Sequence, residues 1–130
     1  MWMIDSSVYI DWMRAGRNQT RIVRPLVEAG QLVSCGLIRV EVLRGIVKPK
    51  VHDEMKALLD ALREIPVTTS VWSRISELAW QLDRNGEVLP VSDLIIGCCA
   101  LLSQAALITT DAHFTKIPGL TLRATVPTWR

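Results

Sequence analysis

The sequence predicts an α/β fold in which helices cover both faces of a central, mostly parallel sheet. Short apolar segments alternate along the chain with longer segments of helical character, and this alternation is typical of βαβ units. Two of the apolar segments, 1–5 and 105–111, end in an aspartate. Ligands of open parallel sheets bind beyond the carboxyl ends of the strands, so we expect the chemistry of the chain at that edge.

The N-terminal part of the chain predicts one strand and two helices. The apolar run MWMI fits a strand buried on both faces. The helix that follows is capped by Ser6 or Ser7 and ends before Gly16. A second helix covers about 19–29, and Pro25 inside it predicts a kink or a late start.

The middle of the chain predicts a second buried strand at 31–35 and two helices, at 36–46 and 49–65. The longer helix opens with a proline and carries an amphipathic stripe of apolar residues at helical spacing. Pro66 ends this helix, and a short strand is expected at Val67.

The C-terminal part predicts two more helices and two strands. Thr69 or Ser70 caps the first helix, and an Asn-Gly pair closes it. The second helix, 93–104, is capped by a serine and is apolar along most of its length, which predicts burial. A strand at 105–111 and a final edge strand at LTLRA complete the sheet.

The composition predicts a single globular domain that covers residues 1–130. Hydrophobic residues make up 49% and charged residues 22%, which excludes a disordered chain. The longest apolar stretch, 94–102, is far shorter than the ~18 residues of a membrane span, and the N-terminus lacks signal-peptide features. The three cysteines form no C-x-x-C pair, so we expect reduced core residues in a cytoplasmic protein.

Four acids stand in apolar surroundings: Asp5, Glu41, Asp93 and Asp111. An isolated ionised carboxylate is costly in such a setting, so it usually has a partner or a metal ion. Asp5 and Asp111 end predicted strands, and Asp93 lies in the first turn of the buried helix. We therefore expect these three at one end of the sheet, within reach of Glu41.

The residues near these acids indicate a metal site. Gly45 and Gly97 each follow an acid by four residues, on the same helix face, and are expected to let the helices approach the sheet closely. Oxygen ligands without a histidine pair or a cysteine pattern predict a hard cation, Mg²⁺ or Mn²⁺. Such an ion can activate a water for cleavage of a phosphodiester bond.

Each acid also has an ordinary explanation when it is considered alone. Asp5 and Asp93 are equally compatible with helix caps or first-turn acids that the helix dipole stabilises. Glu41 is equally compatible with a surface ion pair to Arg39 or Arg44. Asp111 could be a turn residue.

Four segments in order resemble the PIN-domain ribonucleases, in particular the VapC-type toxins of bacterial toxin–antitoxin pairs. The segments are MIDSSVYIDW, GLIRVEVLRG, PVSDLIIGCCAL and LITTDAHFTKIPGL. The resemblance implies a three-layer α/β/α PIN-like domain and a metal-dependent endoribonuclease that hydrolyses RNA. It further implies a homodimer and a cognate antitoxin protein that blocks the site.

The resemblance also implies the residues of the site. The acids that it implies as catalytic and as ligands of Mg²⁺ or Mn²⁺ are Asp5, Glu41, Asp93 and Asp111. The last of these is the position that varies most in the family. Ser6 and one threonine of the pair Thr109-Thr110, taken as Thr110, are implied as accessory polar groups.

Four arginines cluster in eleven residues after the first strand: Arg14, Arg17, Arg21 and Arg24. We consider them candidate contacts to RNA or to the antitoxin, although such clusters are usually a solvated helix face. Of the tryptophans, Trp12, Trp72 and Trp80 are better explained by a core or a dimer interface than by stacking on RNA bases. His52 and His113 belong to different elements and are interpreted as surface residues.

Two other functions compete with the nuclease. A phosphatase or phosphotransferase with Asp5 as covalent nucleophile would commonly need a second aspartate two residues on, where this chain has Ser7. A non-toxin PIN-fold RNA-processing or RNA-binding module is the closer alternative, and the presence of all four acids argues against a module without activity.

Overall fold

The computed structural model describes residues 1–127 and contains a five-stranded sheet with the strand order β3-β2-β1-β4-β5. The strands are β1 (Trp2–Ile4), β2 (Leu32–Cys35), β3 (Arg63–Ile65), β4 (Ala106–Ile108) and β5 (Leu122–Arg123). Every neighbouring pair of these strands is parallel. The predicted parallel sheet is therefore confirmed, and β5 is the edge strand that the sequence indicated.

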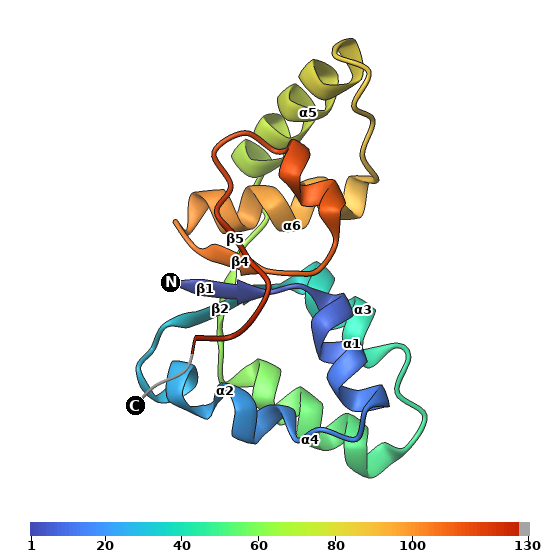
Figure 1. Ribbon diagram of the computed structural model, residues 1–130, viewed down its shortest axis with the longest axis vertical. Coiled ribbons are helices and arrows are strands. Elements are labelled where there is room, and N and C mark those ends of the chain that lie inside the picture. Colours follow the sequence, from blue (N-terminus) through green and yellow to red (C-terminus); the bar gives the residue numbers. More distant parts are fainter. Residues whose placement is uncertain (128–130) are drawn as a thin grey trace.

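Helices cover both faces of the sheet. They are α1 (Ser6–Arg14), α2 (Gln19–Glu28), α3 (Gly36–Leu43), α4 (Pro49–Asp60), α5 (Thr69–Arg84), α6 (Val91–Leu102) and the 3₁₀ helix η1 (Ala112–Lys116). Figure 1 shows α5, α6 and η1 on one side of the strands, and α1, α2 and α4 on the other. The three-layer α/β/α arrangement is thus confirmed.

The central strands are buried because their side chains are apolar on both faces. Met3 and Ile4 of β1 and Leu107 and Ile108 of β4 have no exposed surface. β1 lies between β2 and β4, and Ile4 is paired with Ile108. The chain builds outward from β1 to β3 and then returns to the other side of β1, so the strand order reverses between β1 and β4. Such a reversal is where open α/β sheets bind ligands.

The predicted helix 49–65 is wrong at its C-terminal end. The helix ends at Asp60, and residues 63–65 form β3, where Ile65 is paired with Cys35 of β2. The expected strand at Val67 is therefore also displaced. Buried Leu62 continues the helical spacing of α4, so the apolar pattern does not indicate that the helix ends at Asp60. The chain leaves the helix because residues 63–65 pair with β2.

Other element ends also differ from the expectation. α2 begins at Gln19 and contains Pro25 in its interior, so the late start is wrong. α3 ends at Leu43 rather than at residue 46, and β4 ends at Ile108 rather than at the acid. Thr68, not Thr69, caps α5 through its side chain. These are shifts of a few residues, which change no element order.

The two glycines that follow acids do not share the role expected for them. Gly97 of α6 is buried, and a side chain there would meet Ile117 and Leu120, which come after η1 rather than from the sheet. Gly45 is exposed and has open space around it, so its expected role is wrong. Close packing at Gly97 instead brings the segment that carries η1 against α6.

The cysteines and the helix lengths agree with the composition. Cys35, Cys98 and Cys99 are buried free thiols, which confirms the expectation of reduced core residues. Within residues 1–127, no helix has the length and apolar character needed to cross a membrane.

Candidate metal centre

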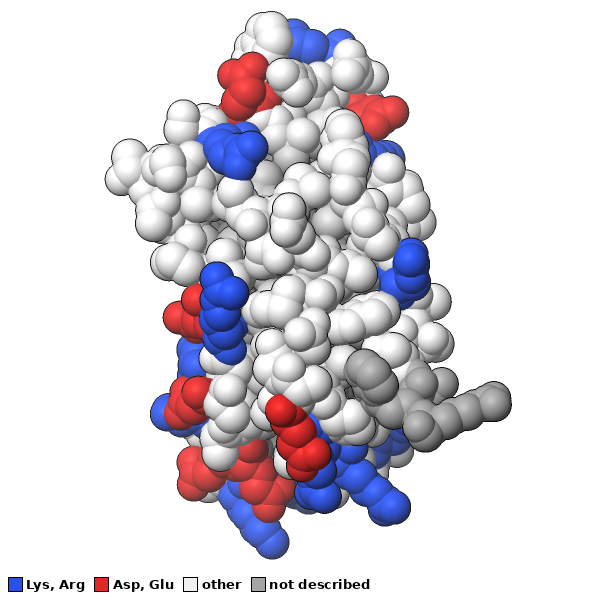
Figure 2. Space-filling model, turned by 90° about the vertical axis from the view of Figure 1, so that its left-hand side faces the viewer, with Lys and Arg blue, Asp and Glu red and all other residues white. Residues whose placement is uncertain are grey.

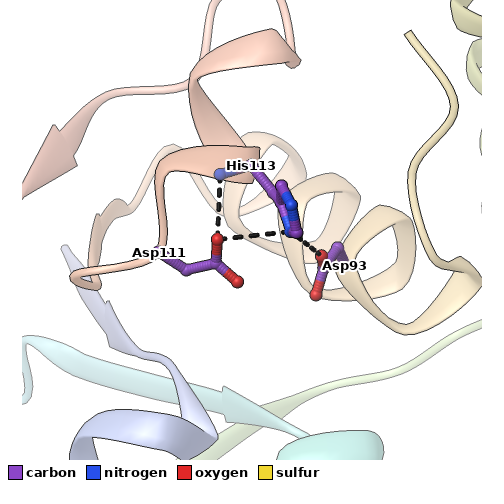
Figure 3. A group of neighbouring side chains, drawn as sticks. All are labelled: Asp93, Asp111 and His113. Carbon is purple, nitrogen blue, oxygen red and sulfur yellow. Dashed lines mark hydrogen bonds and ion pairs between the residues drawn. The ribbon is translucent and has the colours of Figure 1, made fainter.

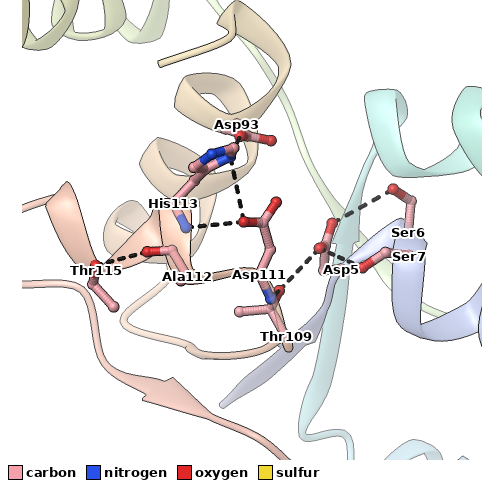
Figure 4. A network of polar contacts seen from close by, with 9 residues as sticks. All are labelled: Asp5, Ser6, Ser7, Asp93, Thr109, Asp111, Ala112, His113 and Thr115. Carbon is pink, nitrogen blue, oxygen red and sulfur yellow. Dashed lines mark hydrogen bonds and ion pairs between the residues drawn. The ribbon is translucent and has the colours of Figure 1, made fainter. Parts of the chain in front are cut away.

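The four acids come from four different elements near the carboxyl ends of the central strands. Asp5 directly follows β1, and Asp111 follows β4 by three residues. Glu41 lies in α3, the helix after β2, and Asp93 lies in the first turn of α6. Figure 4 shows Asp5, Asp93 and Asp111 around one space, with the hydroxyl groups of Ser6, Ser7 and Thr109 at Asp5 and the ring of His113 at the other two.

Asp5 is the most buried of these acids, with 5% of its surface exposed. The Ser7 hydroxyl donates to its Oδ2 at 2.8 Å, and the Thr109 hydroxyl donates to the same oxygen at 3.0 Å. Asp5 occupies the N-cap position of α1, yet its side chain makes no capping hydrogen bond within the described chain. The carboxylate is therefore held by hydroxyl groups and faces the site, so the cap explanation does not account for it.

Glu41 is tied to the same network through Ser6. The Ser6 hydroxyl donates to Glu41 Oε1 at 3.1 Å and lies 3.5 Å from Asp5 Oδ1. Arg39 pairs with Asp60 at 2.8 Å and with Glu64 at 3.3 Å, and no ion pair among residues 1–127 includes Glu41. The surface ion pair considered for Glu41 is therefore wrong, and its half-buried carboxylate is turned toward Ser6.

The threonine that contacts the acids is Thr109, and the choice of Thr110 is wrong. Thr109 is buried, donates to Asp5 and accepts a 3.0 Å hydrogen bond from the backbone N–H of Asp111. Thr110 is exposed at the rim of a surface hollow. Successive side chains of an extended segment point to opposite sides, so only one of the two threonines can face the acids.

A second group joins Asp93, Asp111 and His113 (Figure 3). The Nδ1 atom of His113 lies 3.3 Å from Asp111 Oδ1 and 3.6 Å from Asp93 Oδ2. The backbone N–H of His113 also donates to Asp111 Oδ1 at 2.9 Å, so Asp111 caps η1 as well as facing the site. The interpretation of Asp111 as a turn residue is thus correct for its Oδ1 atom, which accepts this hydrogen bond. His113 is exposed, as expected, but its contact with the acids was not anticipated.

The electrostatics show that the four acids share one region. Burial raises the pKa of Asp93 above its ordinary value, and the charges of Asp111, Asp5 and Glu41 raise it further. His113 opposes this shift. A carboxylate whose pKa responds to three other acids lies in a field that a positive ion would relieve.

The donor atoms suit a divalent cation. One ligand atom each from Asp93, Asp111 and His113 lies within 4.8 Å of the others. Asp5 and Glu41 do not belong to this close group, but Ser6 links their carboxylates and their charges act on Asp93. Hard divalent cations prefer carboxylate oxygens, and an ion here would offset the repulsion between the acids. The residues present therefore fit such an ion.

Arg17 and Arg24 line different hollows of the surface. Arg17 stacks on Trp12, at 5.9 Å from the ring centre, and lines the same hollow as Thr110. Arg24 lines a separate hollow together with Glu28 and Glu54. Figure 2 shows acidic and basic side chains intermixed at the lower end of the molecule, the end formed by α2 and α4.

The tryptophans differ in burial. Trp72 and Trp80 of α5 are 49% and 57% exposed, so the core explanation is wrong for both. Trp12 is half-buried and packs edge-on against Tyr9, with 5.9 Å between the ring centres. Trp12 alone among the three is thus a core-packing residue.

Residues 2–120 match the model of the family described as PIN domain. The chain belongs to the PIN domain family. Among members with names, Ribonuclease VapC11 of Mycobacterium tuberculosis is 27% identical over 126 residues, which cover 93% of this chain and 94% of that protein. VapC ribonuclease Mb1587 of Mycobacterium bovis has the same identity and coverage.

Several solved structures share the fold. VapBC2 from Rickettsia felis, bound to a DNA fragment of its promoter, has a TM-score of 0.77 at 19% identity, over 94% of this chain and 96% of that chain. A toxin–antitoxin complex from Klebsiella pneumoniae has a TM-score of 0.65 at 25% identity, over 93% and 96%.

Replacing Thr109 with Val should destabilise the protein by about 1–3 kcal/mol, because it removes a donor to buried Asp5 and the acceptor of the Asp111 N–H. Thr110→Val is the matched control and should change stability by less than about 0.5 kcal/mol. Urea unfolding of both variants in EDTA measures the difference. Equal effects would show that the hydroxyl of Thr109 does not support the site.

Asp93→Asn should make the metal-free protein more stable than wild type at neutral pH. The folded-state pKa of Asp93 is raised, so the stability that its protonated form contributes is present below the ordinary carboxyl pKa of about 3.9. That contribution is lost as the pH rises through the higher folded-state pKa. The advantage of the variant should therefore grow between about pH 4 and neutral pH.

Urea unfolding of both proteins in EDTA across this pH range tests the prediction. An asparagine variant that is less stable by more than about 1 kcal/mol at neutral pH would identify Asp93 as a structural helix-end residue instead.

Proposed function

We propose that this protein is a metal-dependent endoribonuclease and the toxin of a toxin–antitoxin pair. The observation that carries the proposal is the gathering of four carboxylates, from four elements, at the point where the strand order reverses. Burial raises the pKa of the fourth, Asp93, and the charges of the other three raise it further. Such a cluster is suited to binding divalent cations and to holding a phosphate above them.

In this proposal Asp5, Glu41, Asp93 and Asp111 hold the ion directly or through water. Ser7 and Thr109 fix the carboxylate of Asp5, and Ser6 fixes the carboxylate of Glu41. Asp93 is anchored in the first turn of α6. These contacts hold the oxygens in place before an ion arrives, which reduces the ordering cost of binding.

A divalent cation, Mg²⁺ or Mn²⁺, supplies Lewis-acid activation of water and offsets charge on the scissile phosphate. The chain's own contribution is to orient oxygen donors, among which the Asp111 side chain, 38% exposed, is accessible to a polyanion. No side-chain nucleophile is needed. Asp5, the nucleophile of the rival phosphatase mechanism, receives two hydroxyl hydrogen bonds on one oxygen, which lower its nucleophilicity.

The relatives support an RNA substrate and a protein partner. Two of them are named ribonucleases, and structures with this fold are described as VapBC or toxin–antitoxin complexes. We extend both properties to this chain, together with the homodimer implied by the resemblance. Co-purification with the small protein encoded by the neighbouring gene tests the partner, and light scattering of the purified chain tests the dimer.

Asp5→Asn, Glu41→Gln and Asp93→Asn should each abolish RNA cleavage in Mg²⁺ or Mn²⁺. Loss of an outer partner of a metal ligand costs ~10–100-fold, and loss of a ligand should cost more. Asp111→Asn should be milder, because the amide oxygen can still hold a bound water. Cleavage of RNA by nuclease-free preparations measures these effects.

The matched control is Asp83→Asn, which removes one exposed carboxylate from α5, outside the cluster. It should cleave RNA like wild type. Near-wild-type cleavage by any of the first three variants would remove that residue from the site. RNA binding without cleavage by the wild-type protein would instead favour an RNA-binding module of the same fold.

Among the four arginines, we propose that Arg17 contacts RNA, because it lines a hollow together with Thr110, the residue between Thr109 and Asp111 in the chain. In an Asp5→Asn background, Arg17→Gln should reduce the slope of log affinity against log salt by roughly 0.7 for one lost contact to single-stranded RNA. Arg24→Gln removes the same charge beside Glu28 and Glu54 and should leave the slope unchanged. Fluorescence anisotropy measures both slopes, and equal slopes would contradict the assignment.

A further inference from the structure

His113 is the one cationic or imidazole side chain that lies against the acids within the described residues. The function proposed above uses oxygen donors alone and gives this ring no task. The Nδ1 atom is 3.3 Å from Asp111 Oδ1 and 3.6 Å from Asp93 Oδ2, and Figure 3 shows the ring turned between the two carboxylates. The ring therefore lies next to the position that an ion held by both acids would occupy.

These distances suit ligands of a single ion. With metal–ligand bonds of about 2.1 Å, neighbouring ligand atoms in an octahedron are about 3.0 Å apart and opposite ones about 4.2 Å. The two separations of Nδ1 from the carboxylate oxygens fall between these values, and one ligand atom from each of the three residues lies within 4.8 Å of the others. Small side-chain rotations would suffice to place all three around one ion.

The local backbone holds the ring in this position. The N–H of His113 donates to Asp111 Oδ1 at 2.9 Å, which fixes the first turn of η1 beside the carboxylate. Asp111 Oδ2 takes part in no hydrogen bond or ion pair recorded for residues 1–127, so it remains available to an ion. Buried Phe114 anchors η1 in the core directly after the histidine.

We propose that Nδ1 of His113 is a ligand of the divalent cation, which makes the site favour a transition-metal ion such as Mn²⁺ over Mg²⁺. The inference rests on the metal site proposed above and adds a nitrogen donor to its four carboxylates. Mg²⁺ takes oxygen ligands and retains water, whereas imidazole is a common ligand of transition-metal ions. Binding requires the neutral ring with its lone pair on Nδ1 and its hydrogen on Nε2.

Pulsed EPR of the tag-free protein with Mn²⁺ alone tests the proposal. The chain has two histidines, so an imidazole nitrogen coupled to the ion comes from His113 or His52. His52 lies in α4 and contacts Asp53, and His52→Gln is the matched control. Wild type and His52→Gln should show the ¹⁴N coupling, and His113→Gln should lack it.

Titration with Mn²⁺ and with Mg²⁺ gives a second readout. His113→Gln should weaken Mn²⁺ binding by at least about 10-fold and Mg²⁺ binding by less. The variant keeps the backbone N–H that caps η1, and His113 is exposed, so circular dichroism should show an unchanged fold.

The outcomes separate this inference from the nuclease proposal. Bound Mn²⁺ without a ¹⁴N coupling in the wild-type protein, or with a coupling that persists in His113→Gln, overturns the role of His113. Equal weakening of Mn²⁺ binding and Mg²⁺ binding in His113→Gln also overturns the role of His113 as a ligand. The ring would then only pair with the acids. In each of these cases, the proposed nuclease function would still hold if RNA cleavage depends on metal and is abolished by Asp93→Asn. Absence of any Mn²⁺ binding overturns the inference, and absence of metal-dependent cleavage as well would overturn both.

Discussion

β1 and β4 lie side by side in the middle of the sheet, with Ile4 paired to Ile108, and both strands end at the same edge. The acidic centre depends on this pairing. It places Asp5 next to Thr109, whose hydroxyl joins the Asp5 carboxylate to the backbone of Asp111. Residues more than one hundred positions apart thereby become neighbours, and the helices after β2 and before β4 bring in Glu41 and Asp93.

Bringing four carboxylates together works against stability, and the structure limits that cost without removing it. The hydroxyl groups of Ser7 and Thr109 donate to one buried oxygen of Asp5, and the Ser6 hydroxyl donates to one oxygen of Glu41. None of these hydroxyls carries positive charge, so the mutual repulsion persists, and it adds to burial in raising the pKa of Asp93. His113 is the ring that opposes it. In the proposed function, a divalent cation would offset this repulsion.

Much of this arrangement could be predicted from the sequence because its signals are local. The apolar runs before Asp5 and Asp111, and the first-turn position of Asp93, indicate strand ends and a helix start without any knowledge of contacts. The C-terminal end of α4 could not be predicted, because buried Leu62 fits both a continued helical stripe and the segment that leads into β3. The strand at 63–65 exists through its pairing with β2, which no local pattern encodes.

The choice between Thr109 and Thr110 failed for a related reason. Both threonines follow an apolar strand, and only the direction of the side chain at the end of β4 separates them. His113 carried a usable signal, since an Asp-x-His sequence at the start of a helical turn places the ring beside the carboxylate. The contact with Asp93 could not be inferred, because it depends on how η1 packs against α6 at Gly97.

The central claim is that the four acids hold a divalent cation. Anomalous diffraction from crystals grown with Mn²⁺ tests it most directly, because the signal locates the ion without reference to activity. The account predicts a strong anomalous peak bordered by Asp5, Glu41, Asp93 and Asp111. Mn²⁺ peaks found only elsewhere on the protein, with this cluster free of anomalous signal at saturating Mn²⁺, would contradict it.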